Sequence, residues 1–131
     1  MVAIPTHIID SIVRQAQSEL PNEACGLLTG KGGIVQKHYP LTNTDRSPEH
    51  FSFDPREQFQ VLKEARAEGQ RIVANYHSHP STPARPSVED VRLAYDPDII
   101  YIILSLADET PSIKAFRIQG GEVSNVEIRK I

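Results

Sequence analysis

The stretch that decides the fold is RIVANYHSHP, residues 71–80. Its first six residues are apolar and β-branched enough to predict a strand, in which residues two apart point to the same face. His77 and His79 therefore project together, with Ser78 on the other side. Pro80 cannot continue a central ladder, so we expect the strand to end there and to leave both imidazoles at its mouth.

A carboxylate follows within the next segment. The run SVED, residues 87–90, has the form of a helix start, with Ser87 as N-cap and Asp90 at the third helical position. The helix dipole favours the ionised form of such a carboxylate, and two His with one carboxylate form a catalytic zinc arrangement when a fourth position stays open. Taken singly, each residue has a simpler explanation, since a lone His is usually a surface or core residue and Asp90 could only complete a capping box. Their conjunction favours a site for one divalent metal.

These residues resemble the JAMM signature of the MPN-plus metalloproteases, the Mov34/Pad1-type domains. Seven residues separate His79 from Ser87, two separate Ser87 from Asp90, and Glu23 lies upstream, as in that signature. The resemblance covers most of the chain. It implies one Zn²⁺ per chain, held by His77, His79 and Asp90, with water in the fourth position.

The resemblance also implies the remaining roles. Glu23 is implied to face the metal as general base and acid, although its distance in sequence cannot place it there, and a Glu at a strand start is most often a solvated edge residue. Ser87 is implied to help hold the oxyanion of the tetrahedral intermediate, besides capping its helix.

The implied substrate is a ubiquitin-like protein with a small-residue C-terminal tail. Only 41 residues follow Asp90, too few for the large insertions of eukaryotic members, so the chain looks like the compact prokaryotic type. Some of these process sulfur-carrier proteins, trimming a C-terminal extension or releasing an amino acid. Two alternatives stay open: a general ubiquitin-like isopeptidase, and a non-catalytic MPN scaffold, against which the complete residue set argues.

Composition predicts a small soluble domain. The 131 residues predict a single domain, 1–131, and the net charge of −3 gives no reason to expect nucleic acid as a partner. No secretory signal is evident, and the apolar run at residues 99–104 is too short to span a bilayer. A single cysteine excludes an internal disulfide and is consistent with a reducing compartment, so we expect a cytoplasmic protein.

Helices and strands should interleave along the chain. We expect helices at about residues 6–18, from Asp54 to Gly69, and from Ser87, with strands at 23–29, through Tyr39, at 51–53, from 71, and at about 99–105, 113–119 and 122–129. The pattern predicts an α/β fold, a mixed β-sheet sandwiched by helices, which for the resembled family is the MPN/JAB, cytidine-deaminase-like scaffold. A cytidine deaminase itself requires a Cys-x-x-Cys pair, which one cysteine cannot supply.

Other reactive residues are expected to be structural. Cys25 has no evident partner and is predicted to be a buried strand cysteine. His7, His38 and His50 lack ligand spacing and are predicted to lie on the surface.

Overall fold

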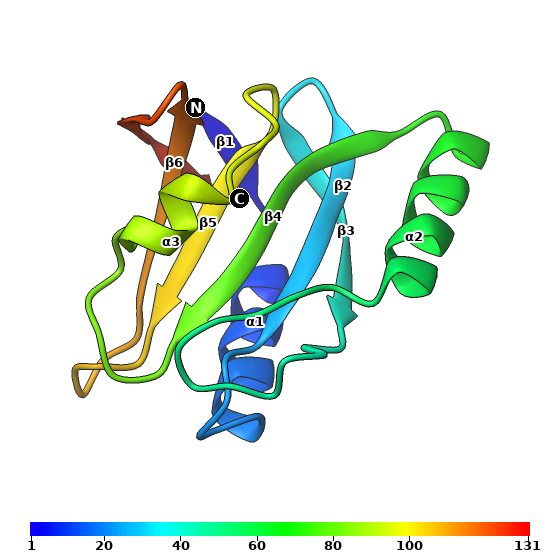
Figure 1. Cartoon of the computed structure of the whole chain (residues 1–131). Helices are drawn as coiled ribbons and strands as arrows, with labels where there is room; N and C mark the ends of the chain where they lie inside the picture. Colours follow the sequence, from blue (N-terminus) through cyan, green and yellow to red (C-terminus); the bar gives the residue numbers. More distant parts are fainter.

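The computed structural model describes residues 1–131 and contains one eight-stranded mixed sheet with three helices (Figure 1). The elements follow the chain in the order β1 (Val2–Ile4), α1 (Thr6–Ser18), β2 (Cys25–Lys31), β3 (Ile34–Leu41), α2 (Pro55–Ala67), β4 (Arg71–His79), α3 (Val88–Arg92), β5 (Ile100–Ser105), β6 (Ser112–Gln119), β7 (Glu122–Val126) and β8 (Ile128–Lys130). The predicted fold class, a mixed sheet flanked by helices, is confirmed. None of the helices combines the length and the hydropathy that a membrane-spanning segment requires.

The strand order is β7-β6-β5-β4-β2-β3-β1-β8, which places the predicted metal strand β4 near the middle. β4 runs parallel to β5 and antiparallel to β2. Both of its edges are therefore hydrogen-bonded, and its side chains alternate between the two faces of the sheet.

One face of the sheet packs on α1. Ile8, Ile9 and Ile12 of this helix form the predicted apolar stripe and contact a cluster that includes Ala74 and Tyr76 of β4. α3 and the chain around it cover the other face, where Ala84 packs with side chains of β5 and β6. His77 and His79 alternate with Tyr76 along β4, so both imidazoles lie on the face opposite α1.

α2 begins as predicted, because Asp54 accepts a hydrogen bond from the Arg56 amide and Pro55 occupies the first helical position. The helix buries Val61 and Ala65 toward the sheet. Phe59 of the same helix is 65% exposed, since its helical position faces away from the strands.

Several expectations were wrong. The strand β1 precedes α1 and was not predicted, because three residues are too few to show a period. Residues 51–53 form only an isolated bridge, Asn43 to Phe53, rather than a strand. The predicted strand at 122–129 is two strands: β7 pairs with β6 at one end of the sheet and β8 pairs with β1 at the other. β7 and β8 lie at opposite ends of the strand order, yet only Glu127 separates them along the chain. The sheet is therefore curled, and its two edges come together at Glu127.

Candidate metal centre

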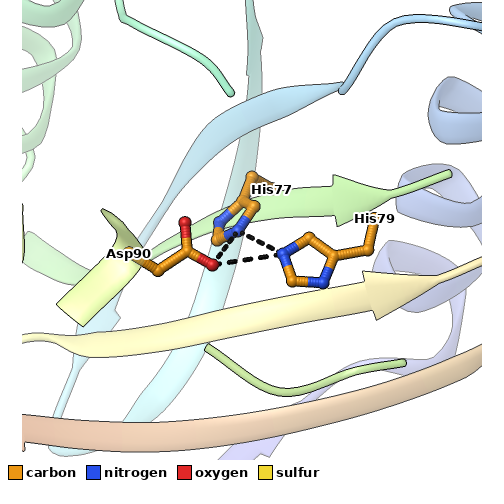
Figure 2. Close-up of side chains that lie close together, drawn as sticks. All are labelled: His77, His79 and Asp90. Atoms are coloured by element: carbon orange, nitrogen blue, oxygen red, sulfur yellow. Dashed lines mark hydrogen bonds and ion pairs between the residues drawn. The ribbon is translucent and has the colours of Figure 1, made fainter. Parts of the chain in front are cut away.

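The three predicted ligands converge on one point (Figure 2). The Nε2 atoms of His77 and His79 lie 3.1 Å apart, and they lie 3.2 Å and 3.1 Å, respectively, from Oδ2 of Asp90. Both His residues are buried, and the Asp90 side chain is 16% exposed. Two imidazole nitrogens and one carboxylate oxygen, close together and shielded from bulk water, form a donor set that suits a divalent cation such as zinc.

Regular secondary structure sets this geometry. β4 ends at His79 as predicted, and α3 begins with a full capping box: the Asp90 amide donates to Oγ of Ser87 at 3.0 Å, and the Ser87 amide donates to Oδ2 of Asp90 at 2.9 Å. The loop between them is held to β5, where Oγ of Ser105 donates to the Thr82 carbonyl. Asp90 therefore lies in the first turn of a helix whose start is fixed by the capping box and by the preceding loop.

The two imidazoles are held in different ways. Nδ1 of His79 lies 2.9 Å from the Pro83 carbonyl, and a proton donated there leaves Nε2 with its lone pair free for a metal. Nδ1 of His77 is buried and has no hydrogen-bond partner. Its ring instead stacks on Phe51, with ring centroids 4.6 Å apart and an interplanar angle of 24°.

Burial and the shared carboxylate shift the ionisation of the three groups. Burial lowers the pKa of His77, which keeps this imidazole neutral. Burial also opposes the charged form of His79, but the hydrogen bonds to Asp90 and Pro83 raise its pKa overall. The directions differ because the Pro83 carbonyl and the charge of Glu23 also act on His79, and His77 has no counterpart of either. Burial opposes ionisation of Asp90 as well, yet the hydrogen bonds from both His side chains outweigh it and lower the pKa of this carboxyl.

Glu23 lies beside the three ligands, but not in the predicted strand. β2 starts two residues later, at Cys25, and Glu23 precedes it in a loop. Its neighbour Ala24 exchanges two hydrogen bonds with Ser78: the Ala24 amide donates to Oγ of Ser78 at 2.8 Å, and the Ser78 amide donates to the Ala24 carbonyl at 2.9 Å. Ser78, on the opposite side of β4 from the imidazoles, thus fixes the chain next to Glu23, a role that its spacing did not indicate.

The Glu23 carboxyl is buried, and it lacks the hydrogen bonds that a buried carboxyl usually makes. The residue is 3% exposed, and its Oε1 atom has no partner. Burial raises the pKa of this carboxyl to about 8; the charges of Asp90 and Glu89 also raise it, while His79 opposes them. A buried carboxyl whose pKa is strongly shifted by its surroundings is a candidate for general acid and base work.

The other sequence predictions have mixed outcomes. Cys25 is fully buried in β2, and burial raises the pKa of its thiol to about 12, so it is the structural cysteine that was predicted. His7 and His50 are exposed. The prediction for His38 was wrong: it is half-buried and hydrogen-bonds the hydroxyl of Tyr76 on the α1 face.

A groove opens beside His77 and Asp90. Its volume is about 460 Å³, and more than half of its lining is hydrophobic. The sheet forms its floor, including Asn75 and Tyr101, while residues 50–53 form one wall and residues from Pro86 to Ile99 form the other. The carboxylates of Glu89 and Asp96 line it, and no Lys or Arg does. Such a groove fits an extended segment of polypeptide next to the metal centre.

The chain is similar to known proteins in both sequence and structure. A family model described as prokaryotic homologs of the JAB domain matches residues 5–119. The CysO-cysteine peptidase of Mycobacterium tuberculosis (strain H37Rv) is 33% identical over 134 residues, covering 100% of this chain and 92% of that protein. The desampylase of Pyrococcus furiosus is 33% identical over 102 residues, covering 78% of this chain and 72% of its own. The solution structure of protein DSY2949 from Desulfitobacterium hafniense has a TM-score of 0.92 at 46% identity, and the match covers 100% of this chain and 93% of that one.

Proposed function

Because this chain belongs to the prokaryotic homologues of the JAB domain, we propose that it is a zinc-dependent peptidase acting at the C-terminal tail of a ubiquitin-like, sulfur-carrier protein. We treat residues 1–131 as its single catalytic domain. One observation carries the proposal: His77, His79 and Asp90 converge within hydrogen-bonding distance of one another, beside a buried Glu23 carboxyl with a free oxygen.

His77 and His79, through Nε2, and Asp90, through Oδ2, would hold the zinc. A zinc ion with one open position supplies a bound water whose pKa is about 7 and polarises a carbonyl oxygen. The protein must then accept a proton from that water, bind the developing oxyanion and protonate the leaving amine.

Glu23 and Ser87 suit these tasks. Burial raises the pKa of Glu23 in the metal-free protein, and a zinc ion at the three ligands would lower it again, so that the ionised carboxylate could accept a proton and then deliver it to the leaving nitrogen. Oγ of Ser87 accepts from the Asp90 amide, so its own hydrogen remains free to donate to an oxyanion. The capping role and the proposed role of Ser87 therefore use different parts of one hydroxyl group.

The relatives support the substrate class. One is named as a peptidase of CysO-cysteine, which fits release of an amino acid from a carrier tail. The groove beside His77 and Asp90 offers room for an extended tail. The second candidate is a general isopeptidase, which the name of the desampylase favours. Comparing a carrier extended by one amino acid with a carrier joined through a lysine side chain distinguishes them, because the first candidate predicts faster cleavage of the extended carrier.

Two substitutions test the division between metal binding and chemistry. Glu23→Gln should keep the zinc and lose at least about 100-fold in kcat, because an amide cannot accept the proton of the water. His77→Ala should lose both zinc and activity. Zinc content by elemental analysis and steady-state rates on the extended carrier give the two readouts. If Glu23→Gln removed the metal as His77→Ala does, Glu23 would be a ligand and the assignment would be wrong.

The scaffold alternative has its own outcome in the same experiment. Wild-type protein that is folded, binds a carrier and cleaves none of the substrates at full zinc occupancy would support a binding domain instead of an enzyme.

A further inference from the structure

The segment between β3 and α2, residues 42–54, borders the metal centre without regular secondary structure. It contains Phe51, which stacks on His77, and Ser47, whose carbonyl accepts a hydrogen bond of 2.8 Å from the Glu23 amide. This segment has no helix or strand hydrogen bonds of its own, so other hydrogen bonds must stabilise its backbone conformation.

Asn43 supplies that fixation. It is 5% exposed, and its side chain makes four hydrogen bonds. Nδ2 donates to the Glu23 carbonyl and to the His50 carbonyl, at 3.1 Å each. Oδ1 accepts from the Asp45 amide at 3.0 Å and from the Ser52 amide at 3.3 Å. Two carbonyl partners on one side and two amide partners on the other fix the orientation of the carboxamide.

The four hydrogen bonds of Asn43 fall into two groups, those accepted by Oδ1 and those donated by Nδ2. The two bonds accepted by Oδ1 close the loop on itself, from residue 43 to residues 45 and 52. One bond donated by Nδ2 crosses to the backbone of Glu23, and the other holds His50, the residue before Phe51. Because Glu23 lies outside β2, this bond and the bond to Ser47 hold its own carbonyl and amide, while the pairing of Ala24 with Ser78 holds the residue that follows it.

We propose that Asn43 is a positioning residue, which sets the place of the Glu23 carboxylate through the Glu23 carbonyl and orients the Phe51 ring against His77. This inference rests on the proposed function, since Glu23 needs accurate placement only if it moves protons at the metal centre. Asn43 does not itself line the groove, although its partners His50 and Ser52 do, and it makes no hydrogen bond to the three ligands. Its main effect is expected in kcat, because a displacement of about 1 Å in a group that takes part in proton transfer costs about 100-fold.

Two variants separate positioning from loop folding. Asn43→Asp keeps the shape and the acceptor oxygen but removes both Nδ2 donors, so it breaks the bond to Glu23 and leaves the turn bonds possible. Asn43→Ala removes all four bonds. Thr44→Val is the matched control: it removes one loop bond, from Oγ1 of Thr44 to the Ser52 carbonyl, and does not reach Glu23.

We expect both Asn43 variants to lose about 30- to 100-fold in kcat per folded, zinc-loaded molecule, a larger effect than the accompanying change in KM. Thr44→Val should stay within threefold of the wild type. In a Glu23→Gln background, the Asn43 substitutions should cost less than threefold, because no base is left to misplace. Equal losses in both backgrounds would overturn the proposal, and so would variants that merely unfold at lower temperature while kcat per folded, zinc-loaded molecule is unchanged.

A readout independent of activity keeps this inference apart from the proposed function. Crystal structures of wild-type and Asn43→Asp protein should show the Glu23 carboxylate displaced by about 1 Å while His77, His79 and Asp90 stay in place. An unmoved Glu23 contradicts the positioning role, whatever the enzyme cleaves. An inactive wild-type protein with a displaced Glu23 in the variant would instead contradict the proposed function alone.

Discussion

At the scale of single residues, the centre combines groups whose ionisation is shifted in opposite directions. The pKa of Asp90 is lowered because both His side chains hydrogen-bond it, although burial opposes this shift, while burial raises the pKa of Glu23 to about 8. Two carboxyls whose charges influence each other thus suit two roles, one as an ionised ligand and one as a proton carrier. The division follows from their surroundings, since both are ordinary carboxyl groups in an unfolded chain.

The raised pKa of Glu23 predicts how pH changes the stability of the metal-free protein. The folded state holds the proton up to about pH 8, whereas the ordinary pKa is 4.5, so the folded state binds more protons between these values. The free energy of unfolding should therefore fall as pH rises from about 4.5 to about 8, and Glu23→Gln should abolish this contribution. Denaturant unfolding of both proteins with chelator at pH 5 and pH 8 measures it. We expect Glu23→Gln to gain about 1 to 2 kcal/mol more at pH 8 than at pH 5, after allowance for solvent screening. An equal difference at the two pH values would contradict the assignment.

At the scale of elements, the strand β4 and the start of α3 could be predicted because their signals are local. The alternation that puts His77 and His79 on one face, and the capping box that presents Asp90, both lie within a few residues of sequence. The place of Glu23 could not be predicted in the same way. It depends on the pairing of Ala24 with Ser78, which are 54 residues apart.

The conformation of the irregular segment before α2 could be predicted even less from local sequence patterns than the place of Glu23. Phe51 was expected in a short strand, and its contact with His77 leaves no periodic signal in the sequence. Asn43 likewise looked like one polar residue among several. Their roles come from the folding of residues 42–54 across the ends of β2 and β4, which is a tertiary event.

The stacking of Phe51 on His77 makes a prediction about metal affinity. Phe51→Ala should weaken zinc binding about tenfold, because the His77 ring has no hydrogen bond at Nδ1 and would lose the group that holds its orientation. Phe59→Ala is the matched control, since Phe59 is 65% exposed on α2. Competition with a chromogenic chelator measures both affinities. Two variants with the affinity of the wild type would show that the stacking does not support the ligand.

At the scale of the whole molecule, the fold class could be predicted from interleaved helices and strands, but the order of the strands could not. β1 and β8 are three residues each and pair with each other at an edge. The curled sheet also leaves β4 paired on both sides at the metal centre. A substrate tail therefore cannot add to a free strand edge there, and the groove over Asn75 and Tyr101 is the surface that remains for it.

The burial of the metal ligands predicts which substrates react. A tail that ends in Gly-Gly reaches the metal without side chains to clash, so replacing its last Gly with Val should abolish cleavage. Changing the amino acid released should alter the rate less than about tenfold, because selectivity lies before the scissile bond. Steady-state rates on a panel of carrier variants measure both effects. Equal cleavage of the Gly and Val carriers would rule out this selectivity.

The proposed chemistry depends on one zinc ion held by His77, His79 and Asp90, and anomalous diffraction from zinc-loaded crystals at the zinc absorption edge would locate that ion. We predict a single anomalous peak about 2.0 to 2.2 Å from Nε2 of both imidazoles and from an oxygen of Asp90, with the fourth position open to solvent. A peak elsewhere, or a zinc-loaded structure in which Asp90 points away from both imidazoles, would contradict the account.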